Sequence, residues 1–82
     1  MIKSMEQKLK RIIANVLNIR EDEIDDDSSM ETVESWDSLK HIELVVSLEE
    51  EFEISQLSTD EIVEMISVAE IKRTLRNKGV DI

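Results

Sequence analysis

Apolar residues recur at helical spacing in four segments of this 82-residue chain, and no proline interrupts them. Ser58 and Ser67 each stand three residues before Glu, and Ser4 stands three residues before Gln, which is the spacing of a capping box at a helix start. Asp37 is a good N-cap residue, and Gly79 is a typical helix stop. The sequence therefore predicts an all-α fold, a small four-helix bundle with a short third helix. The predicted helices cover residues 4–17, 37–52, 58–66 and 67–78.

The size and composition of the chain permit one small hydrophobic core. A domain of this length buries only about 60–65% of the surface that its unfolded chain exposes, so we expect a single domain over residues 1–82. The chain has no cysteine, which excludes a disulfide framework, a thiolate metal site and a nucleophilic thiol. It has neither a signal-peptide pattern nor an apolar run long enough to span a bilayer, so we expect a cytoplasmic protein without stable membrane insertion.

Residues 20–35 have no sustained period and predict a long loop between the first two helices, after a left-handed helix stop at Asn18. The candidate anchors of this loop on the core are Ile24, Met30 and Val33. A loop of this length in a small bundle is commonly functional or flexible.

The net charge of the chain is −10, and the acidity is concentrated in the middle of the sequence. Residues 21–70 hold eighteen Asp and Glu side chains against Lys40 alone. This charge repels nucleic acid and anionic membranes and attracts basic protein surfaces, although an acidic surface that only keeps the protein soluble explains it equally well. We therefore expect protein partners and no nucleic acid.

Three consecutive aspartates, Asp25 to Asp27, raise the question of a calcium loop. If Asp25 were the first position of an EF-hand, a glycine and a glutamate would be required where the chain has Met30 and Trp36. The EF-hand pattern therefore fails. We interpret the run as part of a solvated loop and expect no metal site.

The predicted helix 37–52 carries two apolar faces, whereas a helix that packs into a core on one side needs only one. At about 100° per residue, the two sets of side chains fall on nearly opposite sides of the helix. The wider set is the better core face, and it consists of His41, Leu44, Val45, Leu48 and Phe52. The second set is flanked by acidic residues and consists of Leu39, Ile42 and Val46. It predicts an exposed docking strip, or else a central helix that contacts neighbours on both sides.

Ser38 falls in the first turn of this helix, directly after Asp37. Backbone N–H groups and the positive end of the helix dipole would favour a phosphate ester on its hydroxyl, although a serine at this position is also explained as a capping residue. His41, the only histidine, belongs to the core face and is interpreted as a packed or hydrogen-bonded interior side chain. A Ser-His-Asp hydrolase therefore has little support, and we expect a protein that is not an enzyme.

The stretch D-S-L at residues 37–39, with the I-E-L-V-V-S-L-E-E-E-F that ends at Phe52, resembles the second helix of the acyl carrier protein family. L-K-R-I-I-A-N-V-L-N-I resembles the first helix of that family, E-D-E-I-D-D-D-S-S-M its long loop, and I-S-V-A-E-I the start of its fourth helix. Essentially the whole chain is covered. The resemblance therefore implies a four-helix bundle of the acyl carrier type and a free-standing carrier.

The resemblance implies that Ser38 is the attachment point of 4'-phosphopantetheine, which a phosphopantetheinyl transferase takes from coenzyme A. The thiol of that arm holds acyl groups as thioesters and presents them to acyl- or aminoacyl-ligases, acyltransferases and synthases. Basic surfaces on these enzymes are expected to meet one face of the second helix. The residues of this face are Asp37, Leu39, Ile42, Glu43, Val46 and Glu50. The docking strip is short, so we expect a monomer.

The family also has members in which the interior of the bundle sheathes the acyl chain. The candidates for such a cavity here are Leu44, Leu48, Phe52, Ile62 and Met65. These aliphatic and aromatic side chains are equally suited to an ordinary core, so the pattern leaves both interpretations open.

Several departures from the common carriers of fatty-acid synthesis point to a specialised lipid or polyketide pathway. The glycine that shortly precedes D-S-L in those carriers is absent from Glu34-Ser35-Trp36, and the acid that follows the leucine is replaced by Lys40. The usual proline before the third helix is also missing. Trp36 is either an anchor of the loop or, like Lys40, a partner contact beside the arm.

The cargo of such a carrier stays open at this point. An aminoacyl, D-alanyl or peptidyl carrier is the alternative within the same class. The alternative from another class is an unmodified acidic helical adaptor that binds its partners through the strip of Leu39, Ile42 and Val46 alone.

Overall fold

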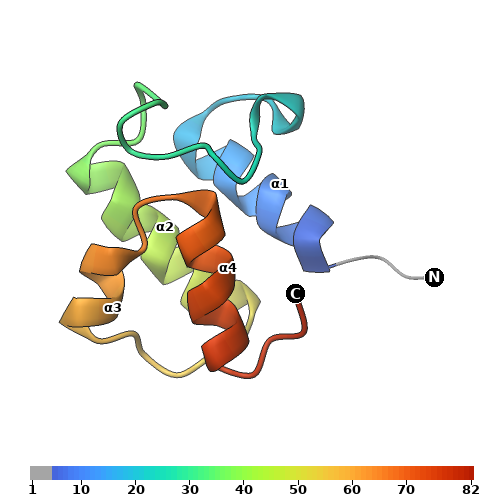
Figure 1. The fold of residues 1–82 in the computed structure, drawn as a ribbon, viewed down its shortest axis with the longest axis vertical. Helices are drawn as coiled ribbons and strands as arrows, with labels where there is room; N and C mark the ends of the chain where they lie inside the picture. The colour runs from blue at the N-terminus through green and yellow to red at the C-terminus, as the bar shows by residue number, and fades with distance from the viewer. Residues whose placement is uncertain (1–4) are drawn as a thin grey trace.

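The computed structural model describes residues 5–82, and this part of the chain forms four α-helices and one turn of 3₁₀-helix without a β-strand (Figure 1). The predicted all-α fold with a short third helix is confirmed. The elements are α1 (Met5–Leu17), η1 (Glu21–Glu23), α2 (Ser38–Glu51), α3 (Thr59–Glu64) and α4 (Val68–Asn77). The predicted cap at Ser4 lies outside the described residues. From residue 5 onward, no helix combines the length and the apolarity needed to cross a bilayer.

Side chains cap the starts of the last three α-helices, at the residues that the sequence predicts. The Asp37 carboxylate accepts the N–H three residues on at 2.9 Å. Ser58 and Glu61 form a reciprocal capping box, in which each side chain accepts the backbone N–H of the other residue. The Ser67 hydroxyl accepts the N–H of Glu70 at 3.2 Å. Because these bonds are local, they satisfy the free N–H groups of each first turn wherever the helix lies in the fold.

Left-handed residues end α1, α2 and α4. Asn18 has φ 59° and Gly79 has φ 96°, as predicted. The predicted end of α2 near Phe52 is confirmed, but the sequence did not predict its left-handed residue, which is Glu53, with φ 53°. There the N–H of Ile54 turns back to the carbonyl of Glu49 at 3.3 Å. A glutamate in this conformation is uncommon, and its side chain gives no sequence signal for a stop.

The core lies where the apolar faces of α1, α2 and α4 meet, and residues from the loops complete it. The helices α1 and α4 are amphipathic and turn their polar faces to solvent. The fully buried side chains include Trp36 from the loop before α2 and Met65 from the connection after α3. The other members of this set are Leu9, Ile13, Leu17, Leu44, Leu48, Val68, Ile71 and Leu75.

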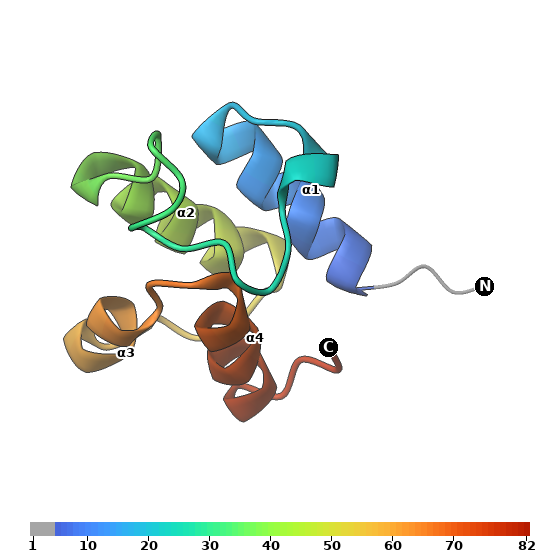
Figure 2. The same cartoon turned by 45° about the horizontal axis from the view of Figure 1, so that its top comes forward.

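The long loop between α1 and α2 crosses the bundle and is tied to the connection between α3 and α4 (Figure 2). The N–H of Met30 donates to the carbonyl of Ile66 at 3.0 Å, and the N–H of Val68 donates to the carbonyl of Ser28 at 2.9 Å. The predicted anchors are confirmed, because Ile24 is buried and Met30 and Val33 pack partly buried against the core. These bonds fix the loop that leads into Ser38.

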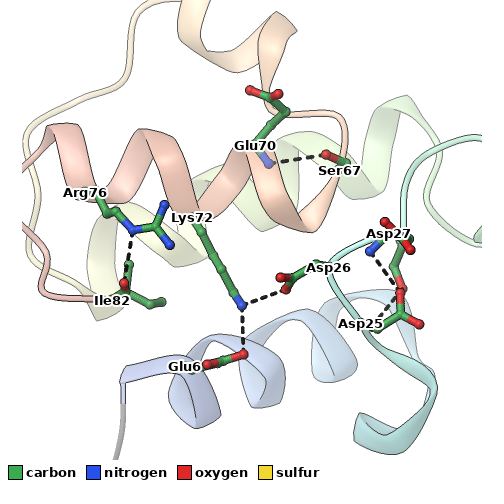
Figure 3. A network of polar contacts seen from close by, with 10 residues as sticks. Glu6, Asp25, Asp26, Asp27, Ser67, Glu70, Lys72, Arg76 and Ile82 are labelled. Carbon is green, nitrogen blue, oxygen red and sulfur yellow. Dashed lines mark hydrogen bonds and ion pairs between the residues drawn. The ribbon is translucent and has the colours of Figure 1, made fainter.

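Lys72 joins three separate parts of the chain (Figure 3). Its ammonium lies 2.7 Å from a carboxylate oxygen of Glu6 on α1 and 2.7 Å from one of Asp26 in the long loop. The Lys72 side chain is only 8% exposed. Hydrogen bonds from Lys72 lower the pKa of Glu6 and Asp26 below their ordinary values. Burial alone would lower the pKa of Lys72, but the hydrogen bonds to Asp26 and Glu6 outweigh it and raise that pKa.

Candidate functional site

Ser38 is the first residue of α2, and its side chain is exposed. The helix cap is the carboxylate of Asp37, so the interpretation of Ser38 as the capping residue is wrong. In the described part of the chain the Ser38 hydroxyl makes no hydrogen bond, so it is not committed to the fold. The structure thus presents an available hydroxyl at the positive end of a 14-residue helix.

Trp36 fixes the turn that presents Ser38. Its side chain is 1% exposed, and its backbone N–H donates to the carbonyl of Val33 at 3.0 Å. The N–H of Asp37 donates to the carbonyl of Ser35 at 3.1 Å. The interpretation of Trp36 as a loop anchor is therefore confirmed. The alternative of a partner contact is wrong for this conformation, because the buried ring leaves no surface for a partner.

A hollow of about 470 Å³ lies beside this turn, between the end of α1 and the start of α2. Val33, Ser35 and Lys40 belong to its lining, and the buried hydroxyl of Ser35 has no hydrogen-bond partner in the described chain. The Lys40 ammonium is half-exposed and lies 3.6 Å from the carboxylate of Glu43. The start of α2 therefore combines a free hydroxyl, unpaired backbone N–H groups and a nearby cation, and these groups suit a phosphate ester.

The second apolar face of α2 is exposed, as the docking interpretation predicts. Leu39 is 68% exposed, Ile42 52% and Val46 46%, whereas Leu44 and Leu48 on the opposite face are completely buried. The alternative, in which α2 contacts neighbours on both sides, is wrong. The carboxylates of Glu43 and Glu50 lie on the exposed side of the helix, but that of Glu49 accepts the N–H of Leu57 at 2.8 Å.

The short helix α3 adds two exposed apolar residues that the sequence did not separate from the core set. Val63 is 65% exposed and Ile66, just after the helix, is 46% exposed. Each follows a more buried residue, Ile62 or Met65, so the apolar residues of this segment form a wider face than one buried side can take. This excess of apolar residues was the sequence signal that could have predicted the exposure of Val63 and Ile66. We call Leu39, Ile42, Val46, Val63 and Ile66 the α2–α3 apolar surface.

His41 is an interior, hydrogen-bonded histidine, as predicted. Its residue is 6% exposed, the Trp36 indole N–H donates to its Nδ1 at 3.0 Å, and its Nε2 lies 2.8 Å from the carbonyl oxygen of Ile62. Both ring nitrogens are therefore occupied by partners other than Ser38. A histidine held in this way is not available as a general base for the serine, so the geometry does not support a hydrolase.

The five candidates for an acyl cavity lie in the core or against it. Leu44, Leu48 and Met65 are completely buried, while Phe52 and Ile62 are partly buried. The Lys8 ammonium lies over the Phe52 ring, 5.0 Å from its centre, in a cation–π contact at the C-terminal end of α2. An acyl chain among these side chains would require the helices to move apart, so a sheathing role stays a prediction.

The aspartates of the long loop have structural partners. Asp26 pairs with Lys72, and an oxygen of Asp25 accepts the N–H of Asp27 at 3.0 Å. Over residues 5–82, no group of three or more His, Cys, Asp or Glu side chains is arranged to hold a metal ion. The run of acids thus serves the loop and its contact with α4.

Residues 7–75 match the family model described as "Phosphopantetheine attachment site". The chain is also 33% identical over 79 residues to the acyl carrier protein of Buchnera aphidicola subsp. Acyrthosiphon pisum (strain 5A), and this match covers 96% of the chain and 98% of that protein. The chain belongs to the acyl carrier protein family. The holo acyl carrier protein from Geobacter metallireducens, solved by NMR in solution, has the same fold, with a TM-score of 0.77 and 25% identity over 88% of this chain and 82% of that one.

Membership of the acyl carrier protein family defines the chemistry of the chain in general terms. Such proteins are carriers and not enzymes, their prosthetic group is 4'-phosphopantetheine, and they interact with phosphopantetheinyl transferases, synthases and other transferases. The prosthetic group supplies the thiol that this cysteine-free chain does not contain. The available serine hydroxyl, the positive helix end and the nearby lysine show that the residues at the start of α2 fit this group.

Proposed function

We propose that Ser38 carries the 4'-phosphopantetheine arm, and that the chain holds acyl intermediates on it for the enzymes of a specialised lipid or polyketide pathway. The observation that carries this proposal is the exposed and unbonded hydroxyl of Ser38, in the first turn of a helix that Asp37 caps. Because the cap is made by another residue, a phosphate ester on Ser38 would disturb no bond of the fold. Free N–H groups of the same turn would stabilise its charge.

Two neighbours of Ser38 would support the arm in different ways. Asp37 holds the first turn in shape through its bond to the N–H of Lys40. The Lys40 ammonium, on the first turn of the helix, balances the carboxylate of Glu43 and would reduce the negative charge near a bound phosphate. A lysine here and the anchored Trp36 are the features that support a specialised pathway over the common fatty-acid carriers.

The α2–α3 apolar surface is the proposed docking site for partner enzymes. Its five exposed side chains would seat a partner, and the exposed carboxylates around them would attract a basic surface and speed encounter. The carboxylates in question are Asp37, Glu43, Glu50, Asp60 and Glu64. The proposed partners are the transferase that loads Ser38 and acyl-ligases, acyltransferases or synthases with basic docking surfaces.

The test of the attachment site is the intact mass of the wild-type chain after incubation with coenzyme A and a promiscuous phosphopantetheinyl transferase. We expect the mass of one phosphopantetheinyl group to be added, and peptide fragmentation should place it on Ser38 and not on Ser35 or Ser47. If no mass is added under conditions that modify a control carrier, the proposal is wrong. The unmodified adaptor would then explain the exposed apolar residues.

The cargo is tested with the loaded chain and a panel of acyl-ligases and amino-acid-activating ligases. We expect an acyl-ligase to form a thioester on the arm and the amino-acid-activating enzymes to leave it free. Efficient loading by an amino-acid-activating enzyme alone would assign the chain to the aminoacyl, D-alanyl or peptidyl carriers.

The docking site is tested by placing a charge in the α2–α3 apolar surface. Ile42→Asp and Val63→Asp should each raise the KM of the loading transferase about tenfold, equivalent to about 1.4 kcal/mol of binding, and leave kcat unchanged. Met5→Asp is the matched control, because Met5 is 42% exposed on α1, away from this surface. Equal KM values for all three variants would refute docking at this surface.

A further inference from the structure

A chain of two hydrogen bonds runs through the interior from the loop before Ser38 to α3. The indole N–H of Trp36 donates to Nδ1 of His41 at 3.0 Å, and Nε2 of His41 lies 2.8 Å from the carbonyl oxygen of Ile62. An indole nitrogen can only donate and a carbonyl oxygen can only accept. The two ends therefore require the same neutral tautomer, in which Nδ1 accepts and the proton lies on Nε2.

These two hydrogen bonds join the loop before Ser38 and the start of α2 to the short helix α3. Trp36 stands two residues before Ser38, and the ring of His41 lies in the first turns of α2. The helix α3 has six residues, none of them buried, and both views show it at the edge of the bundle on the side away from α1 (Figures 1 and 2). Two further side-chain contacts of α3 are an ion pair of 3.1 Å between Glu61 and Lys78 and the packing of the partly buried Ile62 against the core. The Ile62 carbonyl, near the C-terminal end of α3, also accepts the backbone N–H of Met65 at 3.3 Å.

The link from His41 to Ile62 joins two residues that are each next in sequence to a member of the α2–α3 apolar surface. Ile42 follows His41 in the sequence and Val63 follows Ile62, and both are among the exposed residues of that surface. A shift of α3 relative to α2 would therefore move Val63 and Ile66 relative to Ile42 and to Ser38. Because no residue of α3 is fully buried, the hydrogen bond from His41 contributes to its position together with the partly buried Ile62 and the buried Met65 that follows the helix.

We infer that His41 is a positioning residue, which holds α3 in place relative to Ser38 and so sets how well partner enzymes recognise the α2–α3 apolar surface. The inference rests on the proposed function of that surface. It gives His41 a role beyond packing: the protonated ring nitrogen donates to α3, while the indole N–H of Trp36 donates to the other ring nitrogen.

Two substitutions at His41 separate this role from a general effect on stability. His41→Gln places an amide N–H where Nε2 now donates to Ile62, and it loses the acceptor for Trp36. His41→Asn places an amide oxygen where Nδ1 now accepts from Trp36, and it loses the bond to Ile62. Each variant loses one buried bond, so the two should lower the thermal midpoint by similar amounts. Only His41→Asn should raise the KM of the loading transferase, by about fivefold at unchanged kcat, while His41→Gln should keep the wild-type KM.

Trp36→Phe is a second control, since it removes the N–H donor and keeps a buried ring. It should retain the wild-type KM, because the bond from His41 to Ile62 survives. Equal KM values for His41→Asn and His41→Gln would overturn the inference.

Spectroscopy on the wild type tests the link without any enzyme. Nitrogen NMR should show the His41 proton on Nε2, protected from exchange like an amide of α2. The amide shifts of residues 59–66 should move in His41→Asn and stay in place in His41→Gln. A proton on Nδ1, or one on Nε2 that exchanges as in a free imidazole, would overturn the inference even if a variant did not fold. These results do not depend on loading, so a wild type that gains no phosphopantetheinyl mass would refute the proposed function alone.

Discussion

Ser38→Ala is expected to abolish phosphopantetheine loading completely and to change the free energy of unfolding by no more than about 0.5 kcal/mol. The loss is complete because alanine offers no oxygen for the ester. The fold is expected to tolerate the change because the Ser38 side chain is exposed and Asp37 makes the cap. Alanine is also the best helix former, so the start of α2 should not weaken. Intact mass after incubation with coenzyme A and transferase, together with a urea titration, measures both effects.

Two matched variants make this experiment specific. Ser47→Ala removes another hydroxyl from the same helix and should load like the wild type. Asp37→Ala should cost about 1 kcal/mol of stability through the lost cap, whereas Asp37→Asn should keep most of it, because an asparagine side chain also caps. A Ser38→Ala chain that still gains the phosphopantetheinyl mass would place the attachment site at another residue. A Ser38→Ala chain that does not fold would show that the serine contributes to the structure.

Features that depend on local chemistry could be predicted from the sequence. Asp37 and Ser58 cap their helices because a side-chain oxygen reaches an N–H in the next turn whatever the rest of the fold does. The two faces of α2 follow from the helical period alone, and the exposure of Ile42 together with the burial of Leu44 confirms them. The available hydroxyl of Ser38 follows from the same local rule, since the residue before it is the cap.

Features that depend on which elements meet could not be predicted in the same way. Lys72 lies four residues after Val68, on the face of α4 that meets α1 and the long loop. No local sequence signal indicates that Glu6 and Asp26 are its ion-pair partners. The partner of His41 is a backbone carbonyl of α3, which carries no sequence signal at all. The sequence could not distinguish a loop anchor from a partner contact at Trp36, because a ring beside a turn can be buried or exposed. Its burial in the core depends on tertiary packing.

Lys72→Glu is expected to destabilise the fold by about 3–5 kcal/mol, because it would bury a carboxylate between two others. A domain of this size is stable by only about 0.05–0.15 kcal/mol per residue, so the variant should lose a large fraction of its free energy of unfolding. Lys72→Met is the matched control. It fills the same space without charge and leaves Glu6 and Asp26, which are 52% and 63% exposed, to be solvated. Its change in stability should stay within about 1 kcal/mol. Urea titrations measure both, and equal losses would show that packing and not charge decides this site.

The pH dependence of the difference between wild type and Lys72→Met isolates the ion pairs. Lys72 lowers the pKa of Glu6 and Asp26 in the folded state below their ordinary values of 4.5 and 3.8, so this stabilisation is present above those values and is lost as the pH falls through the folded pKa values. The raised pKa of Lys72 acts at the other end, where its contribution is lost as the pH rises above the ordinary value of 10.5 and through the folded one. The advantage of the wild type should therefore be largest near neutral pH and shrink at pH extremes. Repulsion among the remaining carboxylates affects both chains and largely cancels, so an advantage that does not change with pH would mean that the two ion pairs add nothing to stability.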